Sequence, residues 1–344
     1  MNKKLNLKQV SQQLGVSTAT VSNAFNRPNQ LSAKLRERIL RESAELGYHG
    51  PNFAARSLRK GASDVVAVVL ADSISYSLSD PVASQFLQGV AEVLGENKKQ
   101  LLLLSSASDE LEQSSAESLP DGFIFYGAPS GNIFERVSRT GKPIIAVDFE
   151  THDIESVNIN NEEGAFSVAN HALANKPKHA AVLGLRLVDS QRICRLTAQD
   201  MSVESKEISR SRLKGYLRAF EEQQLAISPS HVWHIPLNAP EMAEIAAKEA
   251  LTLNPLPEVI LCMSDVIALS VLRVANKLNI AIPQQVKVTG FDDIPEAQRS
   301  SPGLTTVCQQ SSEKGRVATR LLLKNESKDS VILDTRLVIR ASCG

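Results

Sequence analysis

The sequence predicts an α/β protein with a small helical headpiece at the N-terminus and a larger two-lobed body of parallel sheets flanked by helices. The first 60 residues contain three short helical patterns and hold 11 Lys/Arg against 3 Asp/Glu, whereas the remainder holds 27 against 35. From Val65 onward, short apolar runs alternate with longer helical patterns, which is typical of repeated β-α units. A length of 344 residues is enough for both parts.

Three short helices are predicted in the headpiece. Asn6, Ser17 and Ser32 each precede a segment with apolar residues at helical spacing and are suited to cap it. Gly15 and Gly47 provide stops after the first and third segments. Three short helices with a tight first turn predict a helix-turn-helix, although helices alone would also allow a protein-interaction module.

Charge and composition limit the classes of function that the chain can have. The basic headpiece suits a polyanion. The N-terminus lacks the apolar region of a secretion signal, and the longest apolar runs, such as Val65–Ala71, fall far short of the roughly 18 residues of a membrane span. The four cysteines form no C-x-x-C pair. We therefore expect a cytoplasmic protein with reduced thiols and no cofactor.

The headpiece contains one dense, ordered set of motifs. Its strings are Leu7–Ser11, Gly15–Asn26, Glu45–Tyr48 and Ala55–Leu58. Together they closely resemble the headpiece of the LacI/GalR (lactose-repressor) family of bacterial transcriptional regulators. The resemblance implies that the second helix lies in the major groove of double-stranded operator DNA, with Thr18, Ala19 and Asn23 at the base-reading positions. Asn23 can pair with an adenine edge, while Ala19 offers only a methyl contact.

The resemblance also implies contacts to the DNA backbone. Small hydroxyl and amide groups at helix starts suit phosphate oxygens. The residues that would make these contacts are Ser17, Thr20, Asn26 and Ser32. Simple capping of a helix is the alternative role for Ser17 and Ser32.

A hinge is predicted between the headpiece and the body. The stretch Asn52–Lys60 is too short to form a stable helix alone, so it should become ordered only on DNA. By resemblance to the family it is a hinge helix in the minor groove, with Ala55 and Leu58 on one face and Leu58 as the wedge. An ordinary linker with a chance leucine is the alternative.

Strand and helix patterns alternate through the body. The predicted strands are Val65–Leu70, Leu101–Leu104, Gly122–Tyr126, Pro143–Val147, Ala180–Leu183, His231–Ile235, Val259–Met263 and Val286–Gly290. The predicted helices are 83–97, 162–175, 209–224, 239–252 and 265–278. This pattern predicts parallel sheets with helices on both faces, arranged as two lobes with a ligand cleft between them.

Enzymes can have such a body, but the motifs of their chemistry are missing. No two of the 17 glycines form G-x-G, and the sequence has no G-x-x-x-x-G-K loop, G-x-S-x-G elbow or H-E-x-x-H motif. His231 and His234 would point to opposite faces of a strand, which disfavours a shared metal. We expect neither catalytic residues nor a metal site.

Five strings of the body match one further pattern. They are Lys142–Asp148, Ser211–Tyr216, Ser264–Leu269, Val288–Asp293 and Leu304–Gln309. They resemble the periplasmic-binding-protein-like body of the same family. The resemblance implies effector contacts from Asp148, Arg212, Ser264, Asp292 and Gln309, whose charged and polar groups suit the hydroxyls of a polyol.

Two further residues are candidates for the effector site. Phe86 would supply an apolar wall, and Asp80 follows the first strand near its carboxyl end, where ligands of open sheets bind. Each assignment has a structural alternative. Asp148 and Asp292 could cap the next helix or loop, and Arg212 could form a surface ion pair.

Two segments depart from the family pattern. Ser105–Asp121 is shorter than the usual strand-helix connection, which suggests a truncated helix. Leu185–Ser209 is longer, with charged and polar residues throughout, and is expected to form a surface loop near the cleft.

The sequence thus predicts a sequence-specific regulator, a repressor, whose affinity for a near-palindromic operator is controlled by a small-molecule effector, a sugar or related metabolite. We expect a DNA-binding domain over 1–50, a hinge over 51–62 and an effector and dimerisation domain over 63–344. A homodimer is expected because no leucine heptad tail follows Leu337–Ile339. A periplasmic sugar receptor, disfavoured by the basic headpiece, and a DNA-binding protein whose body only dimerises are the rival predictions.

Overall fold

The computed structural model describes residues 5–50, 62–107, 119–151, 153–205, 207–324 and 329–344. The chain forms two compact units, one of residues 1–65 with 115–121 and one of the remaining residues. The predicted hinge residues Ala55 and Leu58, and the centre of the short Ser105–Asp121 connection, lie outside the described residues. In the described ranges, no helix has the length and apolar character needed to cross a membrane.

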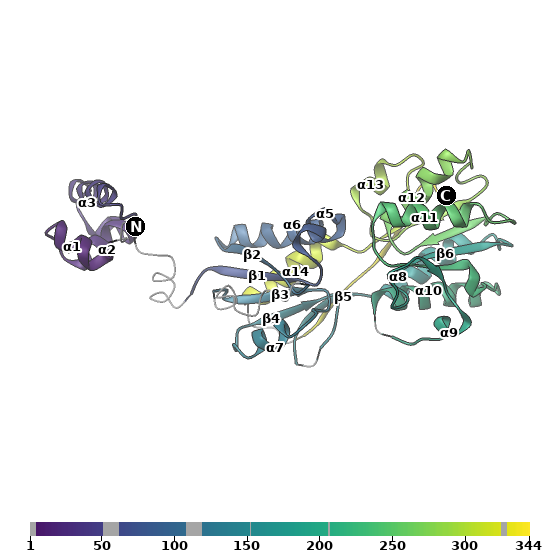
Figure 1. Cartoon of the computed structure of the whole chain (residues 1–344), viewed down its shortest axis with the longest axis horizontal. Coiled ribbons are helices and arrows are strands. Elements are labelled where there is room, and N and C mark those ends of the chain that lie inside the picture. Colours follow the sequence, from purple (N-terminus) through teal and green to yellow (C-terminus); the bar gives the residue numbers. More distant parts are fainter. Residues whose placement is uncertain (1–4, 51–61, 108–118, 152, 206, 325–328) are drawn as a thin grey trace. The chain divides into compact units, whose positions relative to one another are not determined.

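The headpiece is a bundle of short helices (Figure 1). Its elements are α1 (Leu7–Gln13), α2 (Thr18–Asn26), η1 (Pro28–Gln30) and α3 (Ala33–Glu45). The predicted caps are present, since the side chains of Asn6, Ser17 and Ser32 each accept a hydrogen bond from a backbone N–H in the first turn. Gly15 and Gly47 adopt φ values of +64° and +70°, the left-handed conformation that ends a helix.

The first lobe of the body is a six-stranded sheet covered by helices (Figure 1). Its strands are β1 (Val65–Leu70), β2 (Gln100–Ser105), β3 (Gly122–Tyr126), β4 (Ile144–Val147), β5 (Ser156–Ile159) and β12 (Val331–Leu333). Its helices are α5 (Ile74–Ser79), α6 (Pro81–Glu96), α7 (Ile133–Ser138) and α14 (Ser311–Lys324). The order is β12-β5-β4-β3-β1-β2, and β12, β5, β4, β3 and β1 pair in parallel. The next strand, β2, lies on one side of β1, and β3 lies on the other. The order of the strands therefore reverses at β1, and the carboxyl ends of β1 and β3 form a topological switch point.

The second lobe is a five-stranded sheet in the order β10-β9-β6-β8-β7. Its strands are β6 (Ala180–Leu185), β7 (Cys194–Arg195), β8 (Val232–Ile235), β9 (Val259–Cys262) and β10 (Lys287–Thr289). Its helices are α8 (Asn161–Leu173), α9 (Ala198–Met201), α10 (Ile208–Glu222), η4 (Pro229–His231), α11 (Pro240–Leu251), α12 (Asp265–Lys277) and α13 (Pro295–Arg299). All pairs are parallel except β7 with β8. A two-stranded sheet of β11 (Thr306–Cys308) and β13 (Arg336–Val338) lies where the chain crosses between lobes.

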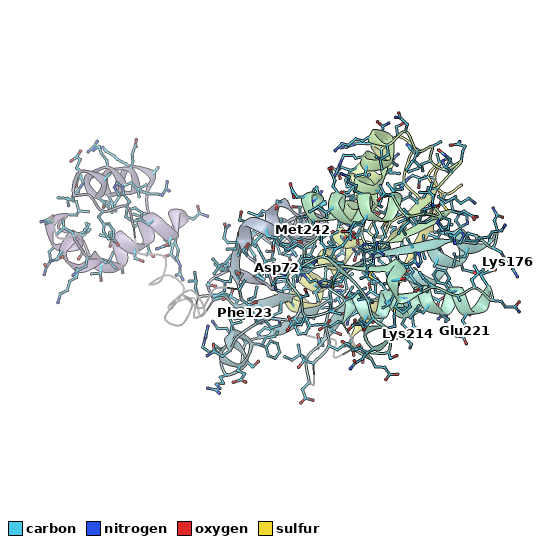
Figure 2. All side chains as sticks on the ribbon, turned by 45° about the vertical axis from the view of Figure 1, so that its right-hand side comes forward. Asp72, Phe123, Lys176, Lys214, Glu221 and Met242 are labelled. Carbon is cyan, nitrogen blue, oxygen red and sulfur yellow. The ribbon has the colours of Figure 1, made fainter. Side chains whose placement is uncertain are left out.

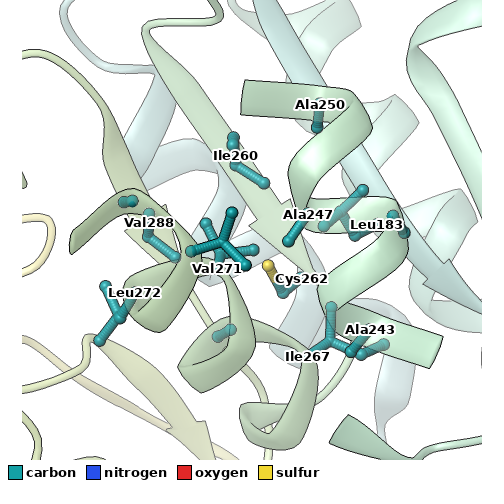
Figure 3. Close-up of a cluster of buried hydrophobic side chains, with 14 of the residues drawn as sticks. Leu183, Ala243, Ala247, Ala250, Ile260, Cys262, Ile267, Val271, Leu272 and Val288 are labelled. Carbon is teal, nitrogen blue, oxygen red and sulfur yellow. The ribbon is translucent and has the colours of Figure 1, made fainter. Parts of the chain in front are cut away.

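The core of the second lobe explains how its helices are fixed. Side chains of α11 and α12 pack on the face of β6, β9 and β10, as seen for Ala247, Val271 and Ile260 in Figure 3. The buried face of helix α10 contains charged as well as apolar side chains. Lys214 is exposed at the outer surface in Figure 2, while Arg212 on the same helix is buried. The helix therefore presents a charged residue to the interior of the lobe.

The prediction of a surface loop over Leu185–Ser209 is wrong. The segment contains β7 and α9, and its Leu187 and Leu196 are buried in the hydrophobic core. Arg210 secures it by donating to the backbone carbonyls of Asp200 and Leu187. The two leucines are separated by charged and polar residues, so the sequence did not show the apolar face that these two side chains share.

Candidate DNA-binding face and effector site

The three predicted base-reading residues share one face of the headpiece. Thr18, Ala19 and Asn23 lie on α2, where Thr18 and Ala19 are exposed. They line a single shallow hollow together with Leu7, Ser22, Asn26 and Arg27. Because Thr18 and Ala19 are exposed at the start of α2, this face can approach base edges in a groove.

The predicted phosphate contacts have local partners in the structure. The Ser17 hydroxyl accepts from Thr20 N at 3.0 Å and lies 2.8 Å from the Thr20 hydroxyl, while Ser32 accepts from Leu35 N at 3.4 Å. The Asn26 amide donates to the Ser22 carbonyl at 2.9 Å. Capping is therefore present at Ser17 and Ser32, and contact with phosphate remains a prediction that capping does not exclude.

Arg212 is the buried cation of the predicted effector site. Its Nε donates to Asn161 Oδ1 at 3.0 Å, and its Nη1 donates to the Met263 carbonyl at 2.5 Å. The same Nη1 lies 3.6 Å from Asp292 Oδ1, and the guanidinium stacks 3.6 Å above the Phe291 ring. Since Arg212 is only 6% exposed, the alternative of a surface ion pair is wrong.

Asp292 connects Arg212 to the segment that returns to the first lobe. Gln309 Nε2 donates to Asp292 Oδ1 at 2.6 Å, and Asp265 N donates to its Oδ2 at 3.3 Å. Burial raises the pKa of Asp292 strongly, Arg212 opposes this, and the negative charges of Asp265 and Asp80 raise it further. Arg212 therefore favours the ionised form of Asp292, which burial and the two neighbouring acids disfavour.

Lys314 continues the chain of contacts into the first lobe. Its Nζ donates to Gln309 Oε1 at 2.8 Å and to both carboxylate oxygens of Asp148, at 2.8 and 2.7 Å. We call the five residues Asp148, Arg212, Asp292, Gln309 and Lys314 the interlobe cluster. Four of the five were predicted from the sequence, and the structure brings them together.

The backbone is unusual at both aspartates of the interlobe cluster. Asp148 has φ of +63° and Asp292 has φ of +134°. Non-glycine residues rarely adopt positive φ, and such strain gathers at functional sites when the surrounding structure maintains it. The two carboxylates are therefore aimed by the fold at a conformational cost, which supports a functional role.

A second polar link joins the lobes through Asp80. Asp80 caps α6 by accepting from Ala83 N at 2.9 Å, and the side chain of Asn238 hydrogen-bonds to it. Asn238 Oδ1 in turn accepts from the Ser264 hydroxyl at 2.6 Å. Burial raises the pKa of Asp80. At the edge of this region, Asp72, labelled in Figure 2, pairs with Arg186 at 3.2 Å.

Tyr126 is a further candidate residue, which the sequence analysis did not single out. Burial raises the pKa of its phenol, and the negative charges of Asp148, Asp80 and Asp292 raise it further. Tyr126 ends β3 at the switch point of the first sheet, and this position was the signal that could have identified it. Phe86, the predicted apolar wall, is fully buried and stacks on Tyr126 with centroids 4.3 Å apart. In this structure Phe86 is a core residue that supports Tyr126.

The histidines of the second lobe have structural roles. His234 is buried in β8, and its Nδ1 accepts from the backbone N–H groups of Leu187 and Val188 at 2.9 and 3.2 Å. His231 ends η4 instead of lying in the strand. Across the described ranges, His, Cys, Asp and Glu side chains nowhere gather in a group of three able to hold a metal ion.

Comparisons with known proteins place both parts of the chain. Residues 6–52 match the model for bacterial regulatory proteins of the lacI family, and residues 179–343 match that for a periplasmic binding protein-like domain. The HTH-type transcriptional regulator Rv3575c of Mycobacterium tuberculosis is 34% identical over 353 residues, which cover 98% of this chain and 96% of that protein. The chain belongs to the LacI family of bacterial regulatory proteins.

Solved structures agree with the family fold. The lac repressor dimer bound to operator and the anti-inducer ONPF has a TM-score of 0.73 at 20% identity and covers 99% of each chain. The complex of the transcriptional regulator CelR with cellobiose has a TM-score of 0.68 at 23% identity, covering 98% of this chain and 99% of that one. The predicted family and fold class are therefore confirmed. This LacI-family chain is a transcriptional regulator with a DNA-binding headpiece and a parallel α/β body.

Proposed function

We propose that this LacI-family regulator is a repressor controlled by a neutral, hydroxylated small molecule, a sugar or related metabolite, bound between the two lobes. The observation that carries the proposal is the interlobe cluster, in which hydrogen bonds and ion pairs connect Arg212 and Asp292 through Gln309 and Lys314 to Asp148, from segments far apart in the sequence. Carboxylate, amide and guanidinium groups together recognise hydroxyls by accepting and donating hydrogen bonds. The cellobiose complex of CelR is consistent with this class of ligand.

The second half of the proposal concerns DNA and assigns a role to each of the three parts of the chain. Residues 1–50 bind a near-palindromic operator, with Thr18, Ala19 and Asn23 reading bases, and residues 51–62 act as the hinge. Residues 63–344 bind the effector and dimerise. The lac repressor structure, a dimer on its operator, supports this arrangement. Closed twofold symmetry of the protein would match twofold symmetry of the operator.

The two halves of the proposal are tested on the full-length protein. Selection of bound duplexes from a random pool should recover a near-palindromic sequence. A thermal-shift screen with neutral sugars and nucleosides, and with their phosphates, should find a neutral compound that raises the melting temperature, because a ligand of the native state stabilises it. That compound should then change operator affinity in a gel-shift titration. Recovery of unrelated DNA sequences, or a response to phosphates alone, would contradict the proposal.

Sedimentation tests the homodimer. The expected mass is that of two chains, and the mass should not rise to that of four chains at high concentration. A stable four-chain species, or a monomer that still binds the selected operator tightly, would contradict it.

A further inference from the structure

Lys314 lies in the interior of the first lobe, an unusual place for a lysine. It is fully buried, and among the described residues no other lysine is buried. Taking an ammonium out of water is costly unless its donors are all satisfied. All three N–H donors of Lys314 have acceptors, namely the two oxygens of Asp148 and Oε1 of Gln309.

Close helix packing fixes Lys314 in this place. A Cβ on Gly315 would collide with the backbone of α6 at Phe86, and a Cβ on Gly89 would collide with the backbone of α14 at Ser312. The two helices therefore approach to backbone contact, which only glycine allows at these positions. The backbone of Lys314, next to Gly315, is therefore held in place against α6.

The contacts of Lys314 also determine how Gln309 is oriented. Because the amide oxygen of Gln309 accepts from Lys314, its amide nitrogen is the group left to face Asp292, 2.6 Å away. A single ammonium thus orients Asp148 at the end of β4 and Gln309 at the crossover between lobes. Both are predicted effector contacts.

We propose that Lys314 is a positioning residue of the effector site, one that holds Asp148 and Gln309 in the orientation that recognises a neutral polyhydroxylated effector. This inference rests on the proposed function and narrows it. Within the interlobe cluster both cations are already paired, Lys314 with Asp148 at 2.7 Å and Arg212 with Asp292 at 3.6 Å. A phosphorylated effector would find no unpaired cation in the cluster, whereas hydroxyl groups can bind to the remaining acceptor positions of the two carboxylates.

The test uses the full-length protein with ribose, glucose, cellobiose and adenosine as neutral probes, and ribose 5-phosphate and AMP as anionic counterparts. The wild type should respond to a neutral probe and not to its phosphate. Lys314→Met should bind that probe about tenfold or more weakly, because the charged hydrogen bonds that orient two contacts are lost. Arg316→Met is the matched control, since it removes a cation from the same helix that pairs with Glu92 and Glu313, outside the interlobe cluster, and it should bind like the wild type.

The double variant Lys314→Met with Asp148→Asn separates positioning from folding. It leaves no unpaired buried charge, so it should recover thermal stability lost in Lys314→Met. Asp148→Asn alone keeps Lys314 and its hydrogen bond to Gln309, so the double variant should bind the neutral probe more weakly than Asp148→Asn does. Equal affinities for the double variant and Asp148→Asn would overturn the positioning role. Wild-type affinity in Lys314→Met would also overturn it, leaving the proposed sugar effector intact. If the wild type binds only the phosphates, or none of the neutral probes, the neutral-effector proposal fails and this inference fails with it.

Discussion

Replacing Arg212 by alanine tests whether the ion pair between Arg212 and Asp292 stabilises the part of the interlobe cluster that lies in the second lobe. The change removes the cation beside Asp292, a carboxylate that is only 4% exposed and already has Asp265 as a neighbour. It also removes the donor to the Met263 carbonyl and the stacking on Phe291. Removing one partner of a buried pair costs about 3–5 kcal/mol, whereas a surface pair costs about 0–1 kcal/mol. We therefore expect Arg212→Ala to lower the free energy of unfolding by about 3–5 kcal/mol.

Trp233 provides the assay. It is the single tryptophan of the chain and is fully buried in β8, in the same lobe as Arg212. Its fluorescence during urea titration reports the unfolding of that lobe. Arg218→Ala is the matched control, because Arg218 lies on the same helix and also stacks on a ring, that of Phe166, at 3.6 Å. Its side chain is 33% exposed and its ion pairs lie at the surface, so its loss should be about 1 kcal/mol or less.

A variant that removes both charges completes the test. Arg212→Met with Asp292→Asn leaves no unpaired buried ion and should recover much of the stability lost in Arg212→Ala. Equal losses for Arg212→Ala and Arg218→Ala would refute the reasoning, as would a double variant no more stable than the single one. Effector binding should be lost in both Arg212 variants, and operator binding should survive in the folded protein.

Three further predictions concern DNA and pH. Affinity for operator DNA should fall steeply with salt in gel-shift titrations, since the basic headpiece displaces counterions from phosphates; a flat response would contradict this mode of binding. Asn23→Ala should cost about 1–3 kcal/mol on the selected operator and relax base preference at one position of each half-site. Burial raises the pKa of Asp265 to about 6, so its carboxyl binds a proton more tightly in the folded state. This contribution should increase the free energy of unfolding as pH falls from about 6 to 4. Asp265→Asn should flatten that part of the Trp233 fluorescence profile, and an unchanged profile would show that Asp265 does not titrate there.

The sequence predicted most of the fold because the buried strands of a parallel sheet are strongly apolar. Strands β1 and β3 lie at the predicted bounds, and all five predicted body helices are present within a few residues. Strands β5, β7, β11, β12 and β13 were missed. They are only two to four residues long, too short for the apolar-run or alternation pattern of a strand to stand out.

The sequence identified members of the interlobe cluster that directly follow a strand, but it did not identify Lys314, whose position is determined by helix packing. Asp148 and Asp292 follow β4 and β10, where the carboxyl ends of parallel strands bind ligands. Lys314 stands between Glu313 and Gly315 in a charged stretch of sequence, which is the pattern of a solvent-exposed helix face. Only the close contact of α14 with α6 shows that this lysine is inside the lobe.

The interlobe cluster lies where the chain crosses between lobes, so binding of the proposed effector there would be linked to the arrangement of the lobes. The backbone of Asp292 forms an isolated parallel β-bridge with that of Cys308 in β11, and its carboxylate accepts a hydrogen bond from Gln309. These contacts connect the second lobe to the segment that returns to the first. An effector whose hydroxyls bind the two carboxylates must share or replace bonds that Lys314, Gln309 and Arg212 now make. A ligand shifts an equilibrium between conformations only by its difference in affinity for them. Because the competing bonds come from both lobes, we expect an effector that binds at the cluster to change the relative stability of the lobe arrangements.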